Sequence, residues 1–444
     1  MPYIPHTPEE EAAMLERIGA QDIDALFADI LSSMKPQSFD LPDGMAEHEV
    51  MVRLRDMAAA NAEGVASFLG GGAYDHSVPA AVDALSGRGE FYTAYTPYQP
   101  EAAQGTLQAI FEYQTAVCRL LGMDVANASV YDGGSALFEA ACMAVRATRR
   151  KKVIVDECVN PLYRDMLRTL GANLEIDFEE VAHKDGLSDQ NALLEAVDDS
   201  TAAIMVQNPG FFGEVRDFSS LFAAAKEKGA RSVVLVNPVM QAVLKTPAEM
   251  GADVAVAEGQ GIGMPLAFGG PYLGILTCST EMVRQMPGRV VGRTQDLDGK
   301  TGYVLTLQAR EQHIRRSRAT SNICSNQALC ALRSLIHLSL LGPEGLKRVA
   351  ETSMLRAREA ERALCALPGV TRFGDAPYGY EFAVKLPMPA EEAVALLLEH
   401  KLAAGLPAGL WYRGLDSVLL VACTEKTTSE DIGRLAKAMA VVLK

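Results

Sequence analysis

The sequence lacks any cysteine pattern that would indicate a metal site or a disulfide framework. Its eight cysteines are scattered, with no CxxC motif and no Cys/His pair at zinc-binding spacing. We interpret them as reduced core residues, and we expect neither a bound metal nor disulfide bonds. Positive charge is also in deficit, because 41 Lys and Arg residues face 56 Asp and Glu residues for a formal net charge of −15. This deficit argues against a nucleic-acid partner.

Targeting and membrane-spanning signals are missing as well. The N-terminus has neither the basic stretch nor the apolar core of a secretory signal, which predicts a cytoplasmic protein. Residues 259–280 carry no charge and are long enough to span a bilayer. Their glycines and prolines would disrupt a lipid-exposed helix, so we predict a tightly packed loop and strand there and no membrane contact.

The sequence does contain a regular alternation of short β-branched runs and helical patterns. Helical patterns at 134–149 and 218–229 lie between such runs. This alternation predicts an α/β fold in which helices cover both faces of a mainly parallel sheet, with ligands at the carboxyl ends of the strands. The candidate strands are 128–131, 153–156, 173–177, 202–206, 232–236, 253–256 and 273–277.

The length of 444 residues predicts two or three domains. A first helix is expected over 8–34, after the start signal Thr7-Pro8-Glu9-Glu10. The irregular stretch that follows, 35–106, is long enough to be functional or to wrap around a partner. The predicted domains are an N-terminal helical arm (1–62), a large α/β domain (63–325) and a small C-terminal α+β domain (326–444).

Beyond residue 326 the pattern changes to long helices and short strands. A final helix is predicted over 428–443, where Thr427, Thr428 and Glu430 stand at the spacing of a capping box. This pattern of long helices and short strands predicts a smaller α+β domain. The other elements expected in it are helices over 326–340 and 343–366 and strands over 369–373, 381–386 and 417–422.

The turn Asp132-Gly133-Gly134-Ser135 lies between a predicted strand and a predicted helix. Backbone N–H groups at such a helix start, together with the Ser135 hydroxyl, suit an anionic phosphate. A tight turn in which Ser135 caps the helix explains the same residues without a ligand. Both interpretations stay open, because a short Gly-Gly-Ser sequence is common.

The stretch 307–318 contains four arginines and His313. Arg310, Arg315 and Arg316 are candidates for anion recognition, because guanidinium groups bind carboxylates and phosphates through two parallel hydrogen bonds. The alternative is a solvated helix face on which these charges pair with one another. Nothing in the sequence assigns His313 a role in proton transfer.

The stretch 91–101, FYTAYTPYQPE, combines three tyrosines with two prolines. The prolines exclude a helix and favour extended turns. Buried tyrosines need hydrogen-bond partners, so this loop suits the wall of a site that is partly apolar and partly polar. A loop packed into the core of its own domain is the alternative.

Five stretches of the sequence resemble a known family. By these motifs the chain is similar, over nearly its whole length, to the two-subunit bacterial P-proteins of the glycine cleavage system. The stretches are FLGGGAYDHSVPAAVDAL (68–85), FYTAYTPYQPEAAQGTLQAIFEYQT (91–115), VYDGGSALFEAA (130–141), GQGIGMPLAFGGPYLG (259–274) and GYVLTLQAREQHIRRSRATSNICSNQAL (302–329).

The resemblance implies a fold and an activity. The fold is that of fold-type-I pyridoxal-phosphate enzymes, with a seven-stranded, mostly parallel sheet and a smaller C-terminal α+β domain. The activity is an oxidoreductase step of glycine catabolism, in which glycine is decarboxylated and its aminomethyl group passes to the lipoyl arm of H-protein. Pyridoxal phosphate serves as the electron sink. The implied assembly has two copies each of subunits 1 and 2.

A lysine is missing where the resemblance places the anchor of the cofactor. In this fold a Lys amine holds the cofactor covalently after a Gly-Ala-Asp-type strand. Here Gln260 and Gly261 follow that strand, and no lysine lies between Lys245 and Lys300. The resemblance therefore implies that subunit 2 carries the Lys and the cofactor, and that this chain is inactive alone.

The carboxylate that would stabilise the protonated ring nitrogen of the cofactor is also missing. The predicted strand 232–236 ends in Asn237-Pro238, and an Asn side chain is neutral. A self-sufficient enzyme would therefore need an unexpected anchor. Lys245 is the least unfavourable candidate, but it precedes the Gly-Ala-Asp strand.

Two hypotheses about function follow. In the first, the chain contributes to the active site of its partner subunit, and Tyr95, Tyr98 and Gln99 contact glycine, the cofactor or the entering lipoyl arm. In the second, the chain is a purely structural subunit that stabilises its partner without touching the site. The uncharged segment 259–274 is compatible with the second hypothesis, because backbone can fill a pocket that no longer holds a cofactor.

Overall fold

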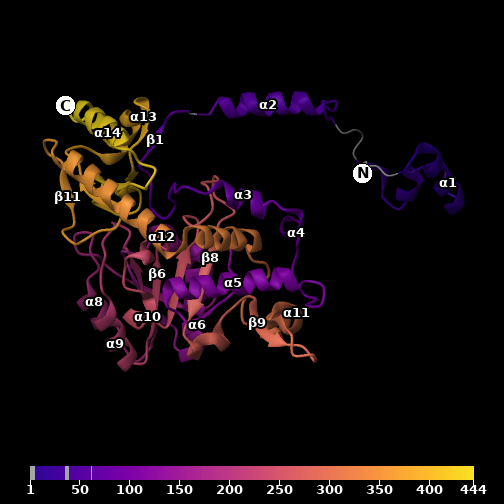
Figure 1. Ribbon diagram of the computed structural model, residues 1–444, viewed down its shortest axis with the longest axis horizontal. Coiled ribbons are helices and arrows are strands. Elements are labelled where there is room, and N and C mark those ends of the chain that lie inside the picture. The colour runs from indigo at the N-terminus through magenta and orange to yellow at the C-terminus, as the bar shows by residue number, and fades with distance from the viewer. Residues whose placement is uncertain (1–5, 36–39, 62) are drawn as a thin grey trace. The chain divides into compact units, whose positions relative to one another are not determined.

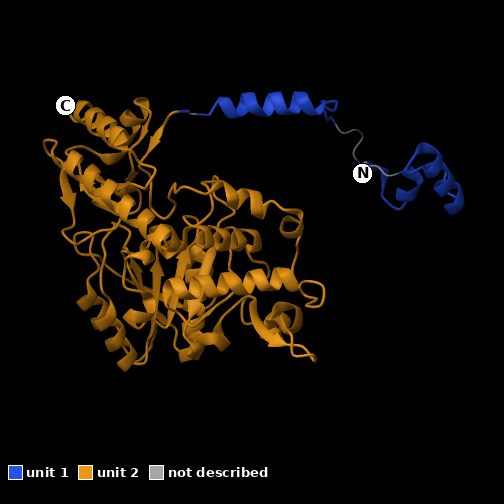
Figure 2. Ribbon diagram, in the orientation of Figure 1, with its two compact units in different colours: residues 1–63 blue, residues 64–444 orange. Residues whose placement is uncertain are grey.

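A computed structural model describes residues 6–35, 40–61 and 63–444 of the chain. The chain divides into two units, residues 1–63 and residues 64–444, which Figure 2 colours blue and orange. The division of the second unit into domains at residues 325 and 326 stays a prediction.

The first unit contains the helices α1 (Pro8–Ile18) and α2 (Glu47–Ala59). The predicted start signal begins α1, where Thr7 and Glu10 form a capping box, but the predicted extension of this helix to residue 34 is wrong. The helix stops because Gly19 adopts a left-handed conformation with φ 74°. Short 3-10 turns at Asp24–Phe27 and Ser32–Met34 follow it. No residue of α1 or α2 is buried.

The centre of the second unit is a seven-stranded sheet. Neighbouring strands are parallel except at β8, which runs antiparallel to both of its neighbours. This mixed, mostly parallel sheet confirms the predicted fold class. Its strands, in spatial order, are β2 (Val125–Ala126), β8 (Gly274–Cys278), β7 (Val254–Glu258), β6 (Arg231–Val236), β5 (Thr201–Asn208), β3 (Lys152–Asp156) and β4 (Asp177–Val181).

Alternate residues of the central strands face opposite sides of this sheet, and both sides are buried. Val153 and Val155 of β3 belong to the core that contains α6 (Gly133–Thr148), whereas Ile154 belongs to the core on the other side. Burial on both faces explains the continuous β-branched runs of the sequence. The helices α5 (Gln104–Leu121) and α12 (Ala328–Cys365) pack side by side (Figure 1).

The C-terminal part of the second unit has a separate, four-stranded antiparallel sheet. The helix α12 leads into it and is interrupted at Gly342, which has non-helical dihedrals and precedes Pro343. This break matches the two helical patterns predicted there. The other elements of this part are β11 (Thr371–Phe373), β12 (Glu381–Lys385), α13 (Ala390–Glu399), β14 (Leu406–Pro407), β15 (Val418–Ala422) and α14 (Ser429–Val442).

The edges of the large sheet differ from the predicted strands. The run 128–131 makes only an isolated bridge between Val130 and Gly274, because Ser129 has a positive φ of 120°. The predicted strand 173–177 is displaced to β4, after Glu175 in a left-handed conformation with φ 54°. The capping box of α14 joins Thr428 to Asp431, not Thr427 to Glu430.

The remaining elements include several that the sequence did not indicate. The stretch 35–106, expected to be irregular, contains α2, α3 and α4, and a hairpin of β9 and β10 follows the large sheet. No helix in the described part of the chain is long and apolar enough to cross a membrane. The full set of remaining helices and strands, which includes the predicted helix α9, is β1 (Ala66–Ser67), α3 (Ala80–Ser86), α4 (Gly89–Tyr92), α7 (Pro161–Gly171), α8 (Gln190–Glu195), α9 (Ser219–Glu227), α10 (Pro247–Met250), β9 (Val290–Gln295), β10 (Thr301–Thr306), α11 (Gln312–Arg315) and β13 (Leu402–Ala403).

Candidate functional site

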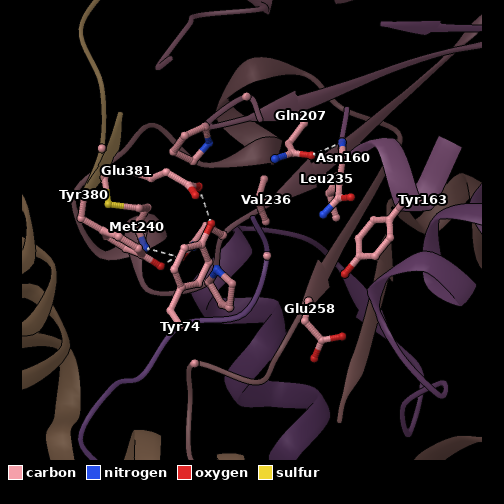
Figure 3. A pocket seen from close by; sticks show the side chains of 17 residues that line it. Tyr74, Asn160, Tyr163, Gln207, Leu235, Val236, Met240, Glu258, Tyr380 and Glu381 are labelled. Atoms are coloured by element: carbon pink, nitrogen blue, oxygen red, sulfur yellow. Dashed lines mark hydrogen bonds between the residues drawn. The ribbon is translucent and has the colours of Figure 1, made fainter. Parts of the chain in front are cut away.

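A pocket opens at the carboxyl ends of β5, β6 and β7. Parallel sheets bind their ligands at this edge, so this is where a cofactor is expected. We call it the Gly261 pocket. Figure 3 shows Tyr74 and Glu381 joined by a hydrogen bond on one side of it, with Glu258 and Tyr163 on the other.

The position expected for the anchoring lysine is crowded by a histidine. A Cβ atom added to Gly261 would lie 3.0 Å from Cδ2 of His76, which is closer than side chains normally pack. His76 is buried, and its Nδ1 lies 2.7 Å from Oε2 of Glu425 while its Nε2 lies 3.4 Å from the hydroxyl of Tyr380. These contacts fix the imidazole in the place where a longer residue at 261 would begin.

The side chain of Asn237, the residue that follows β6, forms hydrogen bonds with other residues of the chain. Its amide donates a hydrogen bond to the Tyr380 hydroxyl. Its Oδ1 accepts the backbone N–H groups of Val239 at 3.1 Å and of Met240 at 3.2 Å. Asn237 therefore shapes the turn after β6 and brings no negative charge to the pocket.

Two carboxylates of the chain itself occupy the turn that precedes α6. Asp132 is the N-cap of α6, and its Oδ1 accepts the N–H of Ser135 at 2.7 Å. Ser135 is thus the capped residue and not the cap. Glu258 Oε2 accepts the N–H of Gly133 at 3.0 Å, and a Cβ at Gly133 would lie 2.9 Å from the Tyr163 hydroxyl. Two of the N–H groups that could receive a phosphate, those of Gly133 and Ser135, are therefore satisfied internally.

The electrostatics of the Gly261 pocket are unfavourable for an anionic cofactor. The described residues that line it include Glu258 and Glu381 but no Lys or Arg. Burial raises the pKa of Glu258 to about 7 and the pKa of Glu381 to about 7. A phosphate group would meet carboxylates here instead of cations. The residues present do not fit pyridoxal phosphate.

The tyrosine loop, residues 91–101, lies at the surface of this chain. Tyr95 is 86% exposed and Tyr98 is 49% exposed, so neither is packed into the core of its own domain. Gln99 is exposed as well. The loop precedes α5, which is anchored to the rest of the second unit by buried residues such as Tyr113.

Tyr98 connects the tyrosine loop to the arginine-rich stretch 307–318. The ring of His313 lies edge-on to the Tyr98 ring at 5.7 Å between centroids. The guanidinium of Arg289 lies 5.7 Å from the centroid of the same ring, a cation–π distance. Two motifs that are distant in the sequence therefore meet in space, and Arg289, which belongs to neither motif, packs against the same tyrosine.

The three arginines predicted from the sequence do not gather around Tyr98. Arg310 is largely buried and donates to the carbonyl of Gly288 at 2.9 Å. Arg315 donates to the carbonyl of Ala309 at 3.0 Å, and Arg316 is exposed. Burial lowers the pKa of Arg310. Arg310 also lies 3.6 Å from Oε1 of Glu311 through its Nε, and the anion-recognition role of all three arginines stays a prediction.

Comparison with known proteins now identifies the family. A family profile described as "Glycine cleavage system P-protein" matches residues 1–439. The chain belongs to this P-protein family. A structure described as glycine decarboxylase (P-protein) of the glycine cleavage system, in inhibitor-bound form, superimposes with a TM-score of 0.94 at 42% identity and full coverage of both chains.

Curated P-protein relatives match the chain from end to end. A probable glycine dehydrogenase (decarboxylating) subunit 1 from Nitratidesulfovibrio vulgaris is 63% identical over 443 residues, which is 100% of each chain. A protein of the same description from Geotalea uraniireducens is 49% identical over 439 residues, 99% of each chain. These matches place the chain among the subunits of this enzyme.

More distant structures share only the P-protein fold. The sphingosine-1-phosphate lyase of Burkholderia pseudomallei has a TM-score of 0.66 at 16% identity, over 93% of this chain and 94% of that one. A glutamate decarboxylase of Lactobacillus brevis has a TM-score of 0.69 at 12% identity, over 93% and 96% of the two chains. The fold is therefore that of fold-type-I pyridoxal-phosphate enzymes.

Sequence reasoning missed His76 and Arg289. His76 reaches the Gly261 pocket from a loop 185 positions earlier in the sequence, with no spacing that could have indicated the contact. Arg289 directly precedes β9, and the hairpin of β9 and β10 was itself not predicted. Its place beside Tyr98 depends on the folded structure alone.

Proposed function

We propose that this chain is the P-protein subunit that forms no Schiff base and that it acts together with subunit 2. In this proposal subunit 2 carries the lysine and the pyridoxal phosphate, in a cytoplasmic assembly with two copies of each subunit. The complex decarboxylates glycine and transfers the aminomethyl group to the lipoyl arm of H-protein. The printed description of the relatives as subunit 1 supports a second subunit as partner.

The observation that carries this proposal is the Gly261 pocket, whose described lining residues include carboxylates but no lysine or arginine. His76 packs against Gly261, so that a Cβ there would lie 3.0 Å from its Cδ2, and Glu258 accepts the Gly133 N–H group that would face a phosphate. His76 and Glu258 each form hydrogen bonds with other residues of the chain. A single substitution at Gly261 would therefore not restore a cofactor site.

The tyrosine loop is our candidate for the contribution of this chain to catalysis. Exposed aromatic side chains such as Tyr95 are stabilised when another surface covers them. We propose that this surface is the active site of subunit 2. There Tyr95, Tyr98 and Gln99 line the wall around glycine or the lipoyl arm. Aromatic burial would also exclude water from the reacting carbon.

The decisive experiment measures activity and visible absorbance for this chain alone, for subunit 2 alone and for their mixture. We expect glycine–bicarbonate exchange only in the mixture, and cofactor absorbance only where subunit 2 is present. Visible aldimine absorbance from this chain alone would contradict the proposal and would favour a self-sufficient enzyme.

A second experiment separates a role in the active site from a structural role. We expect Tyr95→Phe and Tyr98→Phe to lower exchange activity in the assembled complex while assembly, followed by size-exclusion chromatography, stays intact. Unchanged activity in both variants would instead support the hypothesis of a purely structural subunit. That hypothesis is equally compatible with a Gly261 pocket that does not fit the cofactor.

A further inference from the structure

A second cavity lies between the tyrosine loop, α5 and the first turn of α12. We call it the Arg289 cavity. Most of its lining is apolar or aromatic, including Phe91, Ile110, Leu329 and Leu332. Among the described residues that line it, Arg289 alone is charged. A large apolar cavity with few polar groups is typical of a site that binds a small molecule or an extended side chain.

Arg289 is held in place by neutral groups. Its Nη1 donates to Oδ1 of Asn326 at 3.1 Å, and its Nη2 lies 3.5 Å from the Tyr98 hydroxyl. Both partners leave the guanidinium charge uncompensated in the described part of the chain. Arg289 also lines a neighbouring cavity together with His313 and Glu311, so it stands where the two cavities meet, although no ion pair joins the described side chains of Arg289 and Glu311.

A buried hydroxyl without a partner also belongs to the Arg289 cavity. Tyr113 lines the cavity and is 1% exposed, and its hydroxyl has no hydrogen-bond partner among the described residues. Burial raises the pKa of Tyr113, so the phenol stays protonated and can donate. The hydroxyl itself has almost no exposed area, so it lies behind the cavity wall, and recognition of a ligand in the cavity rests on Arg289.

We propose that the Arg289 cavity binds an extended, mainly apolar group that carries a hydrogen-bond acceptor, and that Arg289 recognises this acceptor. Glycine is too small and too polar to use the apolar walls, and a phosphate would find only one cation. The inference rests on the proposed function, in which a lipoyl-lysine arm has this chemistry: methylene groups and a disulfide ring, joined through an amide carbonyl. Arg289 is then a determinant of acceptor specificity.

The test compares Arg289→Met with Arg293→Met in the complex assembled with subunit 2. Arg293 is exposed on β9 and serves as the matched control. Loss of one charged hydrogen bond is expected to raise the KM for lipoylated H-protein about tenfold, while the KM for glycine is unchanged. Arg289→Lys should recover part of this loss, since it restores the charge without the fork of donors.

A second variant tests the cavity without touching Arg289. Ala109 lines the apolar wall, and Ala109→Leu should narrow the space and raise the same KM. Binding is read directly by saturation transfer from the complex to the methylene protons of lipoamide, which both variants should weaken. An equal rise in the KM for glycine would overturn the inference by assigning Arg289 to the glycine carboxylate. Unchanged lipoamide binding in both variants would overturn it as well.

The result is distinguishable from failure of the proposed function. If Tyr95→Phe and Tyr98→Phe lower activity but Arg289→Met and Ala109→Leu leave acceptor binding intact, the tyrosine loop acts in the site and the Arg289 cavity does not. If Arg289→Met prevents assembly, Ala109→Leu alone decides, because normal lipoamide binding in that variant contradicts the inference.

Discussion

We expect Glu258 to make the stability of this chain fall as the pH rises through neutrality. Its carboxylate accepts the N–H groups of Gly133 at 3.0 Å, of Gln260 at 3.0 Å and of Leu273 at 3.2 Å. Burial nevertheless outweighs these hydrogen bonds and raises its pKa from 4.5 to about 7. The folded chain therefore holds a proton on Glu258 that the unfolded chain releases near pH 4.5.

The sign and size of the effect follow from proton linkage. Because the folded state binds the proton more tightly, the stabilisation is complete below the pKa of the unfolded chain and is lost as the pH rises through about 7. At 1.36 kcal/mol per pKa unit, the free energy of unfolding should fall by about 2 kcal/mol between roughly pH 5.5 and 8.5 on account of Glu258. Glu381 adds a change of the same sign, because its pKa is also raised to about 7.

Urea unfolding at the two pH values, followed by circular dichroism, measures this difference. Glu258→Ala should remove about 2 kcal/mol of the pH-dependent change and leave the contribution of Glu381. At the lower pH the variant should be less stable by about 2–4 kcal/mol, because three backbone N–H groups lose their acceptor. Glu399→Ala, at the exposed end of α13, is the control. A variant that keeps the full pH difference would refute the reasoning.

Two further changes test the lysine position and the C-terminal part of the chain. Gly261→Lys should cost about 1–3 kcal/mol in urea unfolding, because its Cβ would lie 3.0 Å from His76, and added pyridoxal phosphate should produce no aldimine absorbance. Stable aldimine in that variant would show that the pocket can open. Thr428→Ala should lower the free energy of unfolding by about 1 kcal/mol through loss of the α14 cap, and Thr428→Ser should restore it; equal stability of all three chains would contradict the assigned cap.

The interior of the fold could be predicted from the sequence because its signals are local. The β5 and β6 strands carry continuous β-branched runs that are buried on both faces, and their predicted bounds are nearly correct. Edge strands failed because they are short and only partly buried: β2 has two residues, and β4 begins after a left-handed Glu175. The hairpin of β9 and β10 was missed because its exposed half is polar.

From the sequence, the candidate sites could be predicted only where an expected residue is missing or where a motif is present. The missing lysine near Gly261 is visible in the sequence, but the histidine that crowds its place is not. Contacts such as His76 with Glu425 join residues 349 positions apart. The same holds for Tyr98 and Arg289, which are separated by 191 positions. No periodicity relates such residues, so only the fold brings them together.

The two cavities of the second unit differ in how their polar groups are satisfied, and this difference bears on where chemistry takes place. Around the Gly261 pocket, Glu258, Glu381 and His76 all have partners inside the chain, so binding a ligand there would break existing hydrogen bonds. Around the Arg289 cavity, a guanidinium without a carboxylate gains from a ligand. A ligand therefore stabilises the second site and destabilises the first. On this argument we propose that the catalytic contribution of the chain comes from the surface of the tyrosine loop and not from the place where its own fold would hold a cofactor.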